Sequence, residues 1–136
     1  MRNNNMELAK KYFQEATRYL RNGKEILQKL KIEYKNYTDA KPVAQACALG
    51  YLAVLKALDG YLLLRGMQVN KLPDTFQGYW TTLTQVLSHN GKIKFNLKRA
   101  YDVLHVRGYY RAGTDVEIIK SGFQAAKFII ETLSKQ

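Results

Sequence analysis

The stretch TDAKPVAQACALGYLAVLKALDGYLLLRG, residues 38–66, decides the fold. Thr38 and Asp39 are both good N-cap residues. Pro42 suits a first helical turn, and Gly66 suits the position just after a helix end. Between these signals, alanine and glycine keep the helix slim, and apolar side chains surround nearly all of it. A helix that is apolar on most sides is buried, so the stretch predicts the central helix of a bundle.

Two charged residues in this stretch argue against a membrane span. Lys56 and Asp59 would each cost about 2.5–3.5 kcal/mol at the centre of a bilayer. The uncharged run from Pro42 to Leu55 is too short to cross one. We therefore expect no membrane partner.

The rest of the chain divides into helix-length segments between glycines and prolines. From about Asn5 to Asn36, apolar residues step alternately by four and three, and Gly23 in this series would let a neighbouring helix approach closely. Three later segments are predicted to be helical: Asp74 to His89, Lys94 to Arg111, and a last helix that Thr114 and Glu117 open as a capping box. The prediction is an all-α fold, an up-and-down antiparallel bundle of four to five helices in a single domain, residues 1–136.

The composition excludes several classes of protein. One cysteine in 136 residues cannot form an intramolecular disulfide, and 46% hydrophobic content is too high for a disordered chain. The N-terminus has no apolar leader, so we expect a cytoplasmic protein. Two histidines and one cysteine lie far apart and give no zinc spacing, and no glycine-rich phosphate loop occurs, so neither a metal nor a cofactor is predicted. Cys47 is expected to be a buried, unreactive side chain.

The formal net charge is +11, and much of the excess is local. Residues 92–113 hold six basic residues against one acidic residue, with tyrosines between them. Basic side chains bind phosphates and aromatic faces stack on unpaired bases, so this segment is a candidate surface for RNA or single-stranded nucleic acid. The candidate binding residues are Lys94, Lys98, Arg107, Tyr109, Tyr110 and Arg111. The alternative is a solvated basic face that keeps the protein soluble.

The motif RAYDVLHVRGYY, residues 99–110, carries the candidate catalytic groups. Arg99 could stabilise the charge that grows on a phosphate during RNA cleavage, and His105 could transfer a proton. Asp102, three residues from both, could orient either one. An offset of six residues in an α-helix sets Arg99 and His105 about 120° apart, so a shared site needs a second helix or a second subunit. The alternative is that His105 is structural, partly buried and hydrogen-bonded to a neighbour.

The helical layout and the motif resemble the HEPN superfamily of all-helical bundles, and the chain looks like a small uncharacterised bacterial branch of it. The resemblance implies that Arg99 and His105 form the catalytic pair of a metal-independent, toxin-like endoribonuclease, completed in a homodimer. It also implies a nucleotidyltransferase-type antitoxin as a possible partner protein. The sequence departs from the family at Ala100, where active members carry a polar residue. A non-catalytic bundle that binds other proteins is therefore the alternative function.

Overall fold

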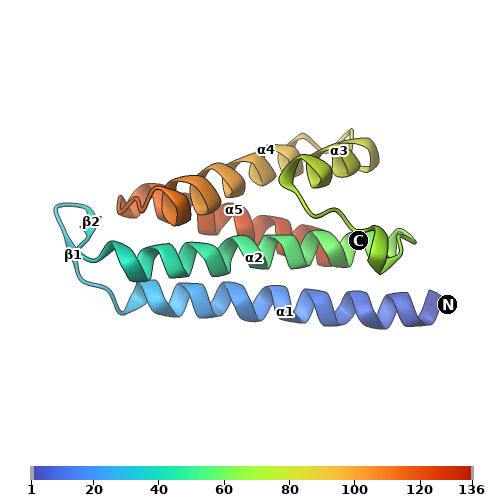
Figure 1. Cartoon of the computed structure of the whole chain (residues 1–136), viewed down its shortest axis with the longest axis horizontal. Coiled ribbons are helices and arrows are strands. Elements are labelled where there is room, and N and C mark those ends of the chain that lie inside the picture. Colours follow the sequence, from blue (N-terminus) through green and yellow to red (C-terminus); the bar gives the residue numbers. More distant parts are fainter. Residues whose placement is uncertain (1, 136) are drawn as a thin grey trace.

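The computed structural model describes residues 2–135, which form a bundle of long antiparallel helices (Figure 1). In chain order the elements are α1 (Arg2–Gln28), β1 (Ile32–Glu33), β2 (Asn36–Tyr37), α2 (Ala40–Leu64), α3 (Phe76–Val86), α4 (Gly91–Ala100) and α5 (Val116–Ser134). A 3-10 turn, η1 (Val69–Lys71), precedes α3, and a π-helical segment, η2 (Tyr101–Tyr110), continues α4. In Figure 1 the chain runs from right to left along α1, back along α2, from right to left again through α4 and η2, and back along α5, while α3 lies over the right-hand end. The predicted all-α up-and-down bundle is confirmed.

The predicted central helix is α2, which packs against α1, α5 and η2. It begins after Asp39, whose carboxylate accepts the Lys41 N–H at 3.2 Å. It ends just before Gly66, where φ is +96°, a conformation that glycine adopts without strain. Val54 and Leu58 on α2 are fully buried in the shared core. Both predicted ends of this helix are therefore confirmed within a residue or two.

The helices approach closely where the sequence places glycine. A Cβ atom on Gly23 would lie 2.9 Å from the Ala46 carbonyl oxygen and 3.0 Å from the Phe123 ring. No side chain fits at that separation, so α1 can pack at this distance from α2 and α5 only with glycine there. The predicted close approach at Gly23 is confirmed.

α2 is also long and apolar enough to cross a membrane, with a mean hydropathy of 1.5 in its most apolar window. In this structure 61% of that window is buried inside the bundle. The core helix of a bundle passes the same test of length and composition, so the helix is accounted for by its place in the core.

The predicted extent of the first helix is wrong at its C-terminal end. α1 stops at Gln28, and the chain then forms a two-residue hairpin turn at Tyr34 and Lys35, both with positive φ (50° and 67°). The hairpin is anchored to the start of α5, because the Tyr37 N–H donates to the Thr114 carbonyl at 2.9 Å. These long-range bonds and the burial of Tyr37 override the helical periodicity of the segment.

The predicted capping box at the start of the last helix is also wrong. Asp115 is the N-cap of α5, and its carboxylate accepts the Ile118 N–H at 2.9 Å. The Thr114 hydroxyl instead donates to the Asn36 side-chain oxygen at 3.1 Å. The hairpin therefore binds the hydroxyl that local sequence assigned to the helix.

Candidate functional site

The helix that carries the predicted motif changes its winding inside the motif. α4 ends at Ala100, and η2 continues to Tyr110 with hydrogen bonds that reach five residues back. One such bond runs from the Arg111 N–H to the Val106 carbonyl at 2.8 Å. π-Helices are rare, are mostly single turns, and occur frequently at functional sites. The π-helical run of ten residues here is unusually long, and it begins two positions after Arg99.

The wider winding places side chains four residues apart close to one line along the helix. The rings of Tyr101 and His105 lie 5.4 Å apart between centroids, and those of His105 and Tyr109 lie 6.0 Å apart. Other helices add to this line. From α2, Tyr51 stacks on His105 at 4.7 Å, and from α3, Phe76 stacks on Tyr101 at 3.9 Å.

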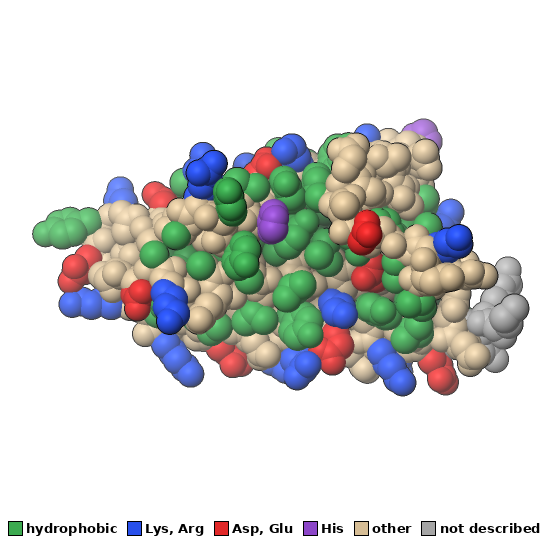
Figure 2. Space-filling model, viewed as in Figure 1, with side chains coloured by type: hydrophobic (Ala, Val, Ile, Leu, Met, Phe, Trp, Pro, Cys, Tyr) green, Lys and Arg blue, Asp and Glu red, His purple; other side chains and the backbone are tan. Residues whose placement is uncertain are grey.

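Together these rings form a continuous row that crosses three helices. The aromatic row, as we call it, consists of Trp80, Phe76, Tyr101, Tyr51, His105 and Tyr109. Figure 2 shows hydrophobic side chains gathered over α2 and over the continuous helix formed by α4 and η2. Most charged side chains lie around the margin of this face. The row is thus an apolar strip with polar surroundings.

His105 lies between Tyr51 and Tyr109 in the aromatic row and is partly buried. Its ring is held by stacking, and within residues 2–135 neither ring nitrogen has a hydrogen-bond partner. Every buried side-chain nitrogen or oxygen in the described chain has a partner, so the nitrogens of His105 must reach the surface. The partly buried position matches the structural alternative for His105, whereas the hydrogen bond to a neighbour that this alternative expected is not found among the described residues.

Arg99 and His105 are not brought together within one chain. The Arg99 guanidinium lies over the Phe95 ring at 5.2 Å, one turn toward the N-terminus, and its side chain is exposed. Asp102 accepts from Lys98 at 2.9 Å rather than from Arg99 or His105. In this arrangement Asp102 orients neither predicted catalytic group.

The remaining predicted binding residues lie toward the two ends of the helix. Lys94 and Lys98 belong to α4, and the Lys98 ammonium also lies 5.7 Å from the Tyr101 ring centroid. Near the other end, Arg107 and Arg111 line one hollow of about 360 Å³ beside the start of α5.

Two tyrosines lie close to these arginines. Tyr109 and Tyr110 are 52% and 70% exposed, and Arg111 lies over the Tyr110 ring at 5.0 Å. One cation, Lys98, therefore lies beside the aromatic row at Tyr101, and another, Arg111, lies beside Tyr110, the chain neighbour of Tyr109.

Sequence reasoning missed the contribution of α2 and α3 to this face. Tyr51 is a large ring on a helix of small residues, and that contrast is the signal that could have identified it. Burial raises the pKa of Tyr51 to about 12, with a smaller contribution from Tyr101. Its hydroxyl therefore stays protonated at neutral pH. Phe76 carries no comparable signal, because only the tertiary structure brings α3 over η2.

A hydrogen bond of 2.7 Å from the Tyr79 hydroxyl to the Asp59 carboxylate fixes α3 on α2. Burial raises the pKa of Asp59, while the bond from Tyr79 and the charge of Lys56 oppose the rise. Burial also raises the pKa of Tyr79, and its bond to Asp59 adds to the rise. The pair holds the helix that supplies Phe76 and Trp80 to the aromatic row.

The other residues considered from sequence have simple settings. Cys47 is fully buried, and burial raises its thiol pKa to about 12, so it is unreactive. His89 is exposed in the turn between α3 and α4. In the part of the chain that the structure describes, no three His, Cys, Asp or Glu side chains come together as a metal ion would require.

Comparison with known proteins places the chain in a family. The sequence pattern of a family described as "Domain of unknown function (DUF5618)" matches residues 11–135. No curated protein matches. A solved structure of a protein of unknown function from Dyadobacter fermentans is similar, with 34% sequence identity and a TM-score of 0.80. The likeness covers 93% of this chain and 97% of that one. The chain therefore belongs to the DUF5618 family, whose function is unknown.

Proposed function

We propose that this protein binds single-stranded RNA along the face formed by α4 and η2. The observation that carries the proposal is the aromatic row, with Lys98 beside Tyr101 and with Arg107 and Arg111 at the C-terminal end of η2. Unpaired bases stack on aromatic side chains, and a basic groove or strip tracks the phosphates. Tyr109 offers an exposed ring face, and the nitrogens of His105 are available to a base or a phosphate.

The charge of this face supports the same function. The acidic residue Asp102 is paired with Lys98, so it adds little repulsion toward a phosphate. No acidic partner is found for Arg107 or Arg111 among the described residues. Two arginines beside an exposed tyrosine are a common way to hold a nucleotide, through charge and stacking together.

RNA cleavage is the second candidate function, and the state of His105 favours it. A partly buried imidazole with both nitrogens free is available for proton transfer. Arg99 has different neighbours from His105 in the same chain, so the proposed cleavage site pairs His105 with Arg99 of a second copy. This accords with the resemblance to the HEPN superfamily, from which we also propose a homodimer and a nucleotidyltransferase-type partner. Exposed apolar side chains at Leu52 and Phe95 are available for such contacts.

A binding assay tests the first function. Fluorescence anisotropy with labelled single-stranded RNA should give an affinity that falls as salt rises from low to physiological concentration. Tyr109→Ala should weaken binding by about fivefold or more, since a stacked base contributes about 1–3 kcal/mol. Tyr34→Ala, which removes an even more exposed tyrosine from the hairpin, should leave affinity unchanged. Binding that ignores both salt and Tyr109 would instead favour a protein-interaction bundle.

A cleavage assay tests the second candidate function, RNA cleavage. The protein is incubated with RNA in EDTA, beside His105→Ala and the control His89→Ala. Loss of cleavage only in His105→Ala supports the proposal, and intact RNA with every protein rejects it. Mixing Arg99→Ala with His105→Ala should restore part of the activity if one site is completed by two copies.

A further inference from the structure

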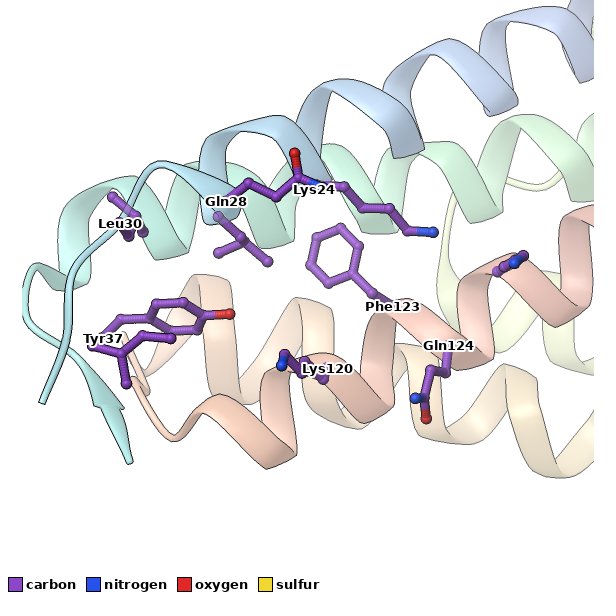
Figure 3. A pocket seen from close by; sticks show the side chains of 10 residues that line it. Lys24, Gln28, Leu30, Tyr37, Lys120, Phe123 and Gln124 are labelled. Carbon is purple, nitrogen blue, oxygen red and sulfur yellow. The ribbon is translucent and has the colours of Figure 1, made fainter. Parts of the chain in front are cut away.

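A second cavity lies on a part of the bundle that the aromatic row does not reach. It is a pocket of about 430 Å³ between the end of α1, the hairpin and α5 (Figure 3). None of its lining residues belongs to the aromatic row. Cavities of roughly 300–1,000 Å³ with mostly apolar walls are typical of small-molecule sites.

The walls of this pocket are apolar on the inside. Leu27 lines the pocket from the end of α1, Leu30 from the turn after it, and Phe123 from α5. Leu27 and Phe123 also belong to the core, so this wall is fixed by packing rather than by a mobile loop. A ligand here needs an apolar body.

Three lysines stand around the pocket: Lys24 from α1, and Lys120 and Lys127 from α5. No acidic side chain lines it. Within residues 2–135, neither Lys24 nor Lys120 has a salt-bridge partner, and Lys127 lies 4.0 Å from Glu131. Charge complementarity therefore calls for an anionic group on the ligand.

Tyr37 supplies a second, independent indication of a ligand. Its side chain is only 5% exposed, and Figure 3 shows its hydroxyl pointing into the pocket. No described residue accepts a hydrogen bond from this hydroxyl. Because every fully buried side-chain oxygen in the described chain has a partner, the hydroxyl must be open to the pocket. Burial raises the pKa of Tyr37, so the group remains a protonated donor at neutral pH. This hydroxyl is therefore a free donor at the wall of an apolar pocket, and a ligand inside the pocket can accept its hydrogen bond.

We propose that this pocket binds a small organic carboxylate with an apolar body. The carboxylate accepts a hydrogen bond from the Tyr37 hydroxyl and pairs with Lys120 across the pocket. The apolar body lies against Leu27, Leu30 and Phe123. Hydrogen bonds to a carboxylate are about twice as strong as neutral ones, so this geometry gives the anion a clear advantage over an uncharged analogue.

Isothermal titration calorimetry with four probes tests the chemistry of the ligand. Decanoate and 2-naphthoate carry the carboxylate on an aliphatic and an aromatic body, and either should bind. Decan-1-ol keeps the body without the charge, and acetate keeps the charge without the body, so both should bind at least tenfold more weakly. Amide shifts of Leu27 and Phe123 in the NMR spectrum should report where the carboxylate binds. If neither larger carboxylate binds, or if decan-1-ol binds equally well, the proposal fails.

Variants test the assigned contacts. Tyr37→Phe keeps the buried ring and removes only the hydroxyl, so it should weaken carboxylate binding about tenfold. Lys120→Met should weaken it as well, whereas Lys11→Met, an exposed lysine of α1 away from the pocket, should not. Thermal unfolding of each variant confirms that the fold is intact. Unchanged affinity in both Tyr37→Phe and Lys120→Met would overturn the assignment, whatever the outcome of the RNA assays.

Discussion

At Gly108 the π-helical segment passes α2 with no room for a side chain. A Cβ atom added there would overlap the Sγ atom of Cys47 and lie 2.8 Å from its Cβ atom. Gly108→Ala should therefore lower the free energy of unfolding by about 1–3 kcal/mol, the usual range for overpacking in a core. Chemical denaturation measures the loss. Adding Cys47→Ala should recover part of it, because the larger of the two obstructing atoms is removed.

A matched glycine provides the control for Gly108. A Cβ atom on Gly91, the first residue of α4, would meet nothing within 4 Å. Gly91→Ala should leave stability unchanged or raise it by up to about 1 kcal/mol. If the effects of Gly108→Ala and Cys47→Ala are simply additive, the two residues are not coupled and the contact does not matter.

The raised pKa of Asp59 predicts how the stability of the fold changes with pH. Burial raises its pKa above the ordinary 3.8, so the folded state holds this proton more tightly than the unfolded chain. As pH rises above 3.8, Asp59 should therefore lower stability until it is ionised in both states. Denaturation of the wild type and Asp59→Asn across this range should show that slope as a difference between them. A difference that does not change with pH would contradict the raised pKa.

A change at Tyr79 tests the contribution of the hydrogen bond between Tyr79 and Asp59. The hydroxyl of Tyr79 stabilises the ionised form of Asp59 through their 2.7 Å bond. Tyr79→Phe should raise the pKa of Asp59 further, because it removes a group that opposes the rise. An NMR titration of the Asp59 carboxyl carbon measures this directly. A pKa that falls or stays the same would show that the bond does not contribute.

Among the elements, the hairpin between α1 and α2 contains two adjacent non-glycine residues with positive φ. Tyr34 and Lys35 form its two-residue turn with φ of 50° and 67°, and Tyr34 is 95% exposed. Turns of this type favour Asn followed by Gly. The double change Tyr34→Asn and Lys35→Gly should raise the free energy of unfolding by about 1 kcal/mol, because left-handed backbone is costly for other residues. Gly66→Ala, at φ +96°, should have the opposite effect. Equal Tm values for the wild type, the double variant and Gly66→Ala would contradict this view of the turn.

The hairpin also shows what the sequence could not provide. The ends of α2 could be predicted because their signals are local: Asp39 caps the first turn and Gly66 ends the last. The end of α1 could not, because Tyr37 and Asn36 are held by residues about 78 positions away, at the start of α5. The same distant contact moved the N-cap of α5 from Thr114 to Asp115. Local patterns fail where tertiary hydrogen bonds decide the end of an element.

The candidate site could likewise be predicted only in part from the sequence. The segment was predictable from the motif and its charge, since Arg99, His105 and the basic residues lie on one helix. Its geometry was not, because periodicity assumes an α-helix and the segment is π-helical from Tyr101. The row that runs through His105 also depends on Tyr51 and Phe76, which reach it only through packing of α2 and α3.

Across the whole molecule, the formal net charge of +11 is shared between two regions that we expect to behave differently. The region around α4 and η2 lies beside the aromatic row, whereas the cations of α1 are spread over its exposed side. Two variants of equal charge separate them. Lys94→Gln, Arg107→Gln and Arg111→Gln together remove three positive charges from the first region. Lys10→Gln, Lys11→Gln and Lys29→Gln remove three from α1 and the turn after it.

RNA binding by these two variants, measured over a series of salt concentrations, tests whether the place of the charge matters. For single strands, each phosphate contact contributes about 0.7 to the slope of log affinity against log salt. Loss of three contacts at α4 and η2 should therefore reduce the slope by about 2, while the α1 variant should stay close to the wild type. The two variants have equal net charges, so their non-specific electrostatic attraction to RNA is reduced equally. If the two variants lose affinity to the same degree, the basic face is a solubility feature and the position of the aromatic row is irrelevant to RNA.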